Sequence, residues 1–249
     1  MEKILFNVLI LLLIAGIVFY REFWKYRGRE APEAENLNEE VSSYQIEIKQ
    51  NSEKTIQDLG FKPNRNLPYS DDISGLSFQS AQNIAKRFII LSYLKDFSTK
   101  NRKEIYSILE KHDLINYLSQ KESRTLKARI ISDGLINDYK WVGESMEVLG
   151  WTLGLWPDLP LYGFCNEKKI KDAVPSEENI SQFIQDAHLI DREEIYQYSD
   201  LIYRLHWTSK RNEIGMLKGL SRDVYMEHHK AINWVIGIES NWDEVPIDT

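Results

Sequence analysis

Two segments near the carboxyl end of the chain hold the residues best suited to chemistry. Residues 200–207 read DLIYRLHW and residues 226–234 read MEHHKAINW. Histidine serves readily as a general base near neutral pH and is a common metal ligand. His206, with a histidine of the second segment, could therefore act in hydrolysis or bind a metal. The candidate cluster is Asp200, Arg204, His206, Trp207, Glu227, His229, Asn233, Trp234, Trp242 and Asp243.

The spacing of these residues favours a structural role over a catalytic one. Glu227 and His229 lie about 200° apart on a helix, so that helix alone cannot direct both into one pocket. Asp200 and Arg204 are spaced i,i+4, as in a helix-surface or half-buried ion pair worth a few tenths of a kcal/mol. No third ligand has a diagnostic spacing, and the chain lacks the glycine-rich phosphate and dinucleotide loops and a His-Glu-x-x-His motif. We therefore expect neither a metal nor a cofactor.

The tryptophans indicate a scaffold around these polar residues. Those predicted to lie on helices are Trp141, Trp151, Trp156, Trp207 and Trp234. Trp242 lies in the C-terminal tail, where an indole is unusual unless the tail docks on the domain. A buried indole N–H needs an acceptor, and Asp243, Asp248 and buried carbonyls are candidates. We expect the C-terminus to dock.

Apolar residues that recur at helical spacing predict the elements that position the cluster. The stripes run through residues 81–91, 105–115, 142–156, 180–187, 195–205 and 224–238. Ser80 and Ser176 are placed as N-caps, and Pro157 ends the third stripe. Gly150 and Gly154 on that stripe suit close helix packing. The sequence therefore predicts a mainly α protein with a single helical domain over residues 51–249.

Composition narrows the class of partner. The chain has 249 residues and a formal net charge of −7, which argues against a nucleic-acid partner because such proteins need a basic surface. Its one cysteine, Cys165, cannot form an internal disulfide or a thiolate metal cage.

The N-terminal segment predicts a membrane anchor. An apolar run from Ile4 to Tyr20 is interrupted only by Asn7, and seventeen residues at about 1.5 Å each give roughly 25 Å, the short end of a bilayer span. A cleaved signal peptide is disfavoured because no small-x-small site follows, and a buried core helix would be unusually apolar on all sides. We expect one transmembrane helix within residues 1–25, with the lipid bilayer as its partner.

The flanking charges predict the orientation of that helix. Lys3 precedes it, whereas Arg21, Lys25, Arg27 and Arg29 follow it. Because basic residues stay preferentially on the cytoplasmic side, we expect a single-pass protein whose soluble domain is cytoplasmic. Residues 26–50 form an acidic connector, and their pattern leaves helix, strand and disorder open.

Several motifs also carry a family resemblance. The pattern W-x-x-E-x-x-x-x-L-x-W-x-L-G runs from Trp141 to Gly154, Tyr-Arg-Leu-His-Trp covers 203–207, Ala-Ile-Asn-Trp covers 231–234, and Trp-Asp-Glu-Val-Pro-Ile-Asp-Thr covers 242–249. Together with residues 52–61 and 66–68, they make residues 51–249 resemble the bacterial domain-of-unknown-function family 4272. The resemblance implies a helical soluble domain without an assigned activity, and it supplies no catalytic residue. The membrane segment lies outside it.

We therefore expect a membrane-anchored helical module that binds a partner protein on the cytoplasmic face. One alternative is a hydrolase-like enzyme that uses His206, Glu227 and His229 around a pocket framed by Trp207 and Trp234. The other is an immunity-type protein that neutralises a toxin. Convergence of the three side chains on an open cleft would favour the enzyme, whereas their burial among indoles would disfavour it.

Overall fold

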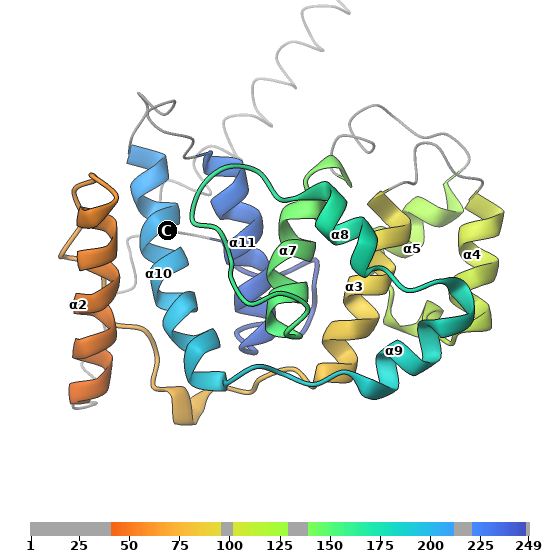
Figure 1. Ribbon diagram of the computed structural model, residues 1–249, viewed down its shortest axis with the longest axis horizontal. Helices are drawn as coiled ribbons and strands as arrows, with labels where there is room; N and C mark the ends of the chain where they lie inside the picture. The colour runs from red at the N-terminus through yellow and green to blue at the C-terminus, as the bar shows by residue number, and fades with distance from the viewer. Residues whose placement is uncertain (1–40, 96–101, 129–138, 212–220, 248–249) are drawn as a thin grey trace, which may run out of the picture. The chain divides into compact units, whose positions relative to one another are not determined.

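The computed structural model describes residues 41–95, 102–128, 139–211 and 221–247. Within these ranges the chain is helical and contains no strand, which confirms the mainly α prediction (Figure 1). The helices are α2 (Ser43–Asp58), α3 (Ala81–Lys95), α4 (Arg102–Lys111), α5 (Gln120–Lys127), α7 (Val142–Thr152), α8 (Glu167–Ala173), α9 (Ile180–Asp186), α10 (Arg192–Arg211) and α11 (Arg222–Val235). Three 3-10 turns, Ile73–Gly75, Ile115–Tyr117 and Glu177–Asn179, lie between them.

Helix α7 occupies the centre of the unit formed by residues 41–249. It packs against α3 on one side and α11 on the other, and α10 and then α2 extend the row beyond α11 (Figure 1). Every residue of α7 is buried, including Glu144 and Glu147. A helix covered on all sides must satisfy its polar side chains internally, so these two carboxylates need partners within the domain.

Helix α2 begins inside the segment whose conformation the sequence left open. Its N-cap is Ser42, which forms a capping box with Gln45: each side chain bonds the other residue's backbone N–H. Ile48, Ser52 and Ile56 form its buried face against α10. The helix therefore runs through residue 50, where we had placed the end of the connector.

Helix α7 ends earlier than its apolar stripe predicted. The stripe continued to Trp156, but the helix stops at Thr152 and Gly154 adopts a left-handed conformation with φ of 68°. The chain then turns back, and the indole of Trp156 packs so closely on Gly150 that a Cβ there would lie 2.2 Å from the ring. Gly150 is closely packed, but against an indole from the following loop and not in the helix–helix contact we expected, and Gly154 lies beyond the helix. The helical placement of Trp156 was also wrong, because glycine termination overrides the stripe.

Two other predicted boundaries also shift. Ser80 accepts a hydrogen bond from the backbone N–H of Asn83, as expected of a cap. Ser176 instead precedes the 3-10 turn Glu177–Asn179, and α9 starts only at Ile180. The last stripe was expected to reach Ile238, but α11 ends at Val235 and Ile238 lies beyond it.

The structure describes the C-terminal tail as far as residue 247 but does not describe the N-terminal segment of residues 1–40. Trp242 is buried on the domain, which confirms docking of that part of the tail, whereas Asp248 lies outside the described residues. The predicted span from Ile4 to Tyr20 also lies outside them. Among the helices in the described part of the chain, none is both long and apolar enough to cross a bilayer.

Candidate functional site

Asp200 and Arg204 form a buried ion pair on α10. Nε of Arg204 donates to Oδ2 of Asp200, Nη2 donates to Oδ1, and both distances are 2.8 Å. Each side chain is 1% exposed. The expectation of a surface or half-buried pair was therefore wrong, because α2 and residues 68–71 cover this side of α10.

The ion pair holds the segment of residues 68–71 in place. Arg204 donates to the carbonyl of Pro68 at 2.9 Å, and the hydroxyl of Ser70 donates to Asp200 at 2.7 Å. The hydroxyl of Tyr196 donates to the backbone carbonyl of Asp71 at 2.6 Å. Three side chains of α10 thus fix a stretch that is about 130 residues away in sequence.

His206, His229 and Asn233 form a hydrogen-bonded chain between α10 and α11. Because Asn233 Nδ2 donates to the carbonyl of Pro246 at 2.9 Å, its 3.1 Å contact with His229 Nε2 is a donation to that nitrogen. Nδ1 of His229 then carries the proton and donates to Nδ1 of His206 at 3.1 Å. Burial, with a smaller contribution from His229, lowers the pKa of His206 to about 3. His206 is therefore neutral near pH 7, and both ring nitrogens of His229 are engaged in hydrogen bonds.

A cavity of about 270 Å³ opens beside these hydrogen-bonded side chains. The fixed segment 68–71 forms one wall, and Tyr203, His229 and Asn233 contribute another. Ile238 and Pro246 complete it on the C-terminal side. It combines aromatic and apolar surface with polar residues that include Asn233, three tyrosines and Asp71. The ion pair lies behind its wall. We refer to it as the α10–α11 pocket.

Glu227 and Lys230 lie on another face of α11. Ser145 of α7 donates to Glu227 at 2.7 Å. Burial raises the pKa of Glu227 and lowers that of Lys230, while their opposite charges act in the reverse sense. Both line a second cavity of about 360 Å³, which Trp242 and Asp243 also border.

Trp234 and Trp242 pack together next to this second cavity. Trp242 meets Trp234 edge-on, with ring centroids 5.5 Å apart, and the guanidinium of Arg87 lies 5.1 Å from the Trp242 ring. Trp234 donates to a backbone carbonyl at 3.1 Å. The carboxylate of Asp243 accepts from the backbone N–H of Lys121 at 2.8 Å, so it anchors the tail and not an indole.

The predicted cluster therefore divides between two faces. Asp200, Arg204, His206, His229 and Asn233 gather around or behind the α10–α11 pocket, and Glu227, Trp234, Trp242 and Asp243 gather on the other face. Trp207 lies half-buried on α10. The hydrolase set of His206, Glu227 and His229 does not converge, as the helical geometry of α11 indicated.

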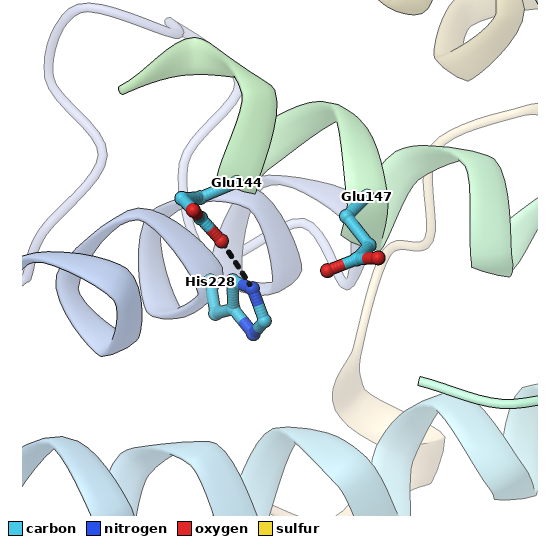
Figure 2. Close-up of side chains that lie close together, drawn as sticks. All are labelled: Glu144, Glu147 and His228. Atoms are coloured by element: carbon cyan, nitrogen blue, oxygen red, sulfur yellow. Dashed lines mark ion pairs between the residues drawn. The ribbon is translucent and has the colours of Figure 1, made fainter. Parts of the chain in front are cut away.

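Three further residues converge that sequence reasoning did not select. Figure 2 shows Glu144 and Glu147 on α7 and His228 on α11, with the Glu144 carboxylate directed at the imidazole 3.5 Å away. None of the three is more than 3% exposed. One ligand-type atom from each lies within 4.8 Å of the others. We refer to these residues as the α7–α11 carboxylate–histidine cluster.

The residues around this cluster come from the loop before α8, from α8 itself and from α10. The backbone N–H of Cys165 donates to Glu144 at 3.1 Å, and Lys169 pairs with Glu147 at 2.9 Å. The hydroxyl of Tyr198 lies 2.8 Å from Nδ1 of His228. Burial, reinforced by Glu144, raises the pKa of the Cys165 thiol to about 12, so this thiol is not a reactive thiolate at neutral pH.

The sequence did contain a signal for this cluster. Glu144 and Glu147 are three residues apart within the otherwise uncharged segment 142–153, and such spacing places both on one helix face. Carboxylates on a helix that is buried all round need partners inside the protein. His228 gave no comparable signal, since its position opposite α7 depends on tertiary packing.

The family model described as Domain of unknown function (DUF4272) matches residues 48–245. The chain belongs to this family. No curated protein and no solved structure matches this chain.

The DUF4272 match covers both faces just described. It starts within α2 and ends three residues beyond Trp242, so the docked tail is part of the DUF4272 domain. The resemblance inferred from the tryptophan and acid motifs is thereby confirmed. The apolar segment from Ile4 to Tyr20 lies outside the matched residues.

Proposed function

We propose that this DUF4272 protein is a membrane-tethered binding module whose recognition site is the α10–α11 pocket. The observation that carries the proposal is the construction of this pocket. A buried ion pair fixes one wall, and a hydrogen-bonded histidine pair stiffens the other. Rigid walls suit recognition, because little ordering entropy is then lost on binding.

The size and lining of the pocket indicate what it accepts. About 270 Å³ is below the roughly 300–1,000 Å³ typical of small-molecule sites, and it suits one inserted side chain. Tyr69, at 41% exposure, and Ile238, at 40%, lie at its rim and offer apolar surface to an approaching partner. We infer that a partner protein inserts an apolar or aromatic side chain, with the side-chain oxygen of Asn233 and the hydroxyl of Tyr203 available for hydrogen bonds.

Site-specific photocrosslinking tests this proposal in the full-length chain in its native membrane. Benzoylphenylalanine replaces Tyr69, and irradiation is expected to give a discrete adduct with one partner. Ile238→Arg puts a charge at the pocket rim and should abolish the adduct. Ile46→Arg changes a residue of similar exposure, 37%, on α2 and should preserve it. An adduct unaffected by Ile238→Arg contradicts the proposed recognition site.

The tether is the second part of the proposal. The run from Ile4 to Tyr20 has the length and composition of a short span, and the basic residues after it favour a cytoplasmic domain. Leu11→Arg with Ile14→Arg should release the full-length chain from the membrane fraction, since each central arginine costs about 2.5–3.5 kcal/mol on insertion. Val41→Arg with Ile46→Arg adds the same charge outside the segment and should leave fractionation unchanged.

An immunity-type role is one form of this function, in which the partner is a toxin. The partner captured through position 69 decides between that role and another interaction. A toxin partner should lose its toxicity when co-expressed with the wild-type chain and regain it with Ile238→Arg.

A further inference from the structure

We propose that the α7–α11 carboxylate–histidine cluster binds one divalent transition-metal ion, with Zn²⁺ as the best-fitting ion. Two carboxylates and an imidazole converge on one point from two packed helices (Figure 2). Mixed oxygen and imidazole ligands suit Zn²⁺ and its first-row neighbours better than they suit Ca²⁺ or Mg²⁺. This site is separate from the α10–α11 pocket and does not depend on the proposed function.

The imidazole supplies the observation that sets this site apart from an ordinary acidic cluster. His228 is 2% exposed, and its Nε2 makes no hydrogen bond with any described residue, although it faces the Glu144 carboxylate at 3.5 Å. A buried polar atom without a hydrogen bond destabilises the fold, because it has lost its water partners and gained none in return. Coordination of a metal through the Nε2 lone pair removes that destabilisation.

The surroundings of the cluster already hold each ligand in orientation. Nδ1 of His228 contacts the Tyr198 hydroxyl at 2.8 Å, which turns Nε2 toward the carboxylates. In the coordinating tautomer Nδ1 carries the proton and donates it to the phenol oxygen. Backbone N–H groups of Cys165 and Asn166 donate to Glu144 and Glu147, respectively. Metal-binding histidines and carboxylates are commonly restrained in this way.

The distances and charges are close to what a bound ion requires. Ligand bonds of about 2.0–2.2 Å place donor atoms roughly 3–4 Å apart, so the 4.8 Å spread must contract slightly through side-chain rotation. Two carboxylates supply two negative charges, which Lys169 offsets only in part. Lys169 contacts Oε1 of Glu147 and leaves Oε2 for an ion. Its positive charge makes it a competitor of the metal.

Competition by Lys169 distinguishes a metal site from a simple ion-pair network. If a metal binds, Lys169→Met removes a neighbouring positive charge and should lower the Kd for Zn²⁺ several-fold. If the cluster only pairs charges, the same change leaves Glu147 uncompensated without creating any affinity for Zn²⁺. The two hypotheses therefore predict different results for one substitution.

Isothermal titration calorimetry of the chelator-stripped full-length protein in detergent, with ZnCl₂, measures the binding. We expect one Zn²⁺ per chain. His228→Gln and Glu147→Gln should each raise the Kd at least about 100-fold, and Tyr198→Phe should raise it about 10-fold. His112→Gln, a half-buried histidine elsewhere, serves as the matched control and should leave the Kd unchanged.

Two results would overturn the proposal. The first is an absence of Zn²⁺ uptake by the wild-type chain. The second is uptake that persists in His228→Gln but is lost in His206→Gln, because the ion would then lie at the His206–His229 pair. Circular dichroism checks that each variant keeps its helices. If His228→Gln does not fold, Tyr198→Phe and Lys169→Met, with their opposite expected effects on Kd, decide the question.

Discussion

Asp200 and Arg204 show how strongly burial changes the meaning of one residue spacing. The Lys168–Asp172 pair on α8 has the same i,i+4 spacing, but its side chains are 85% and 59% exposed. An exposed pair contributes at most about 1 kcal/mol, whereas removal of one partner of a buried pair strands the other charge. The two pairs therefore form a natural comparison within one protein.

Removal of one carboxylate from each pair tests this difference. Asp200→Ala should lower the free energy of unfolding by about 3–5 kcal/mol, because the Arg204 charge stays buried without its partner. Asp172→Ala should change it by less than about 0.5 kcal/mol. Urea denaturation followed by circular dichroism measures both, and similar losses in the two variants would show that the Asp200 pair is solvated.

His206 should make stability depend on pH. Its pKa is about 3 in the folded state against 6.5 when unperturbed, because burial disfavours the charged ring. As the pH falls below 6.5 the unfolded chain takes up a proton that the folded chain does not. The contribution of His206 to the free energy of unfolding is therefore fully present above that pH. It is lost as the pH falls toward 3, by up to about 1.4 kcal/mol per pH unit.

A comparison of variants isolates this contribution from that of other titrating groups. Between pH 7 and pH 5 the wild-type chain should lose about 2 kcal/mol more stability than His206→Gln does. Urea denaturation at the two pH values provides the measurement. Equal losses would place the His206 pKa near its ordinary value.

At the scale of helices, the sequence predicted where each helix lies better than it predicted the residues at which the helix ends. The periodic stripes located α3, α4, α10 and α11, since apolar residues recur at helical spacing in each. The ends depend on contacts distant in sequence: Trp156 folds back on Gly150, and Gly237 meets the backbone at Ser77. Helices α5 and α8 were not predicted because each contains only one or two apolar residues and so has no stripe, although Ser119 and Glu122 carry a capping-box signature before α5.

The candidate site was predictable to a similar degree. The angular argument for α11 correctly separated Glu227 from His229, because it needs only the geometry of one helix. The partners of each residue could not be inferred from the sequence, because they come from elements distant along the chain. Helices α7 and α10 pack against α11, and residues 68–71 bond to α10, only in the folded domain. The cluster with Glu144 was missed for the same reason.

The end of α11 allows a test of a close backbone approach. Gly237 has φ of 82°, and a Cβ there would lie 2.0 Å from the carbonyl oxygen of Ser77. Gly237→Ala combines left-handed strain with a clash against the backbone, and should cost about 2–4 kcal/mol. Thermal unfolding measures the loss.

Two other glycines separate these contributions. Gly163 has φ of 84° in open space, so Gly163→Ala reports strain alone, about 1–2 kcal/mol. Gly75 has neither feature, and Gly75→Ala should stay within about 0.5 kcal/mol. A Gly237→Ala loss no larger than that of Gly163→Ala would show that Ser77 moves aside easily.

At the scale of the whole domain, the tail is an integral part of the packing. Trp242 is 5% exposed and contacts Trp234, Arg87 and Lys230. Trp242→Ala should lower the free energy of unfolding by about 3–5 kcal/mol and make the C-terminus sensitive to protease. Phe164→Ala removes an aromatic ring that is 69% exposed and should have little effect. A neutral Trp242→Ala variant would mean that the tail only rests on the surface.

The contact between α2 and α10 has a consequence for synthesis of the chain on the ribosome. Ser70 meets Asp200 across 130 residues of sequence, and α2 packs on the same helix. At about 5–20 residues per second, translation needs roughly 7–26 s to make the intervening stretch. Until α10 emerges, the apolar face of α2 has no docking surface there, so this nascent polypeptide presents Ile48 and Ile56 to chaperones for many seconds.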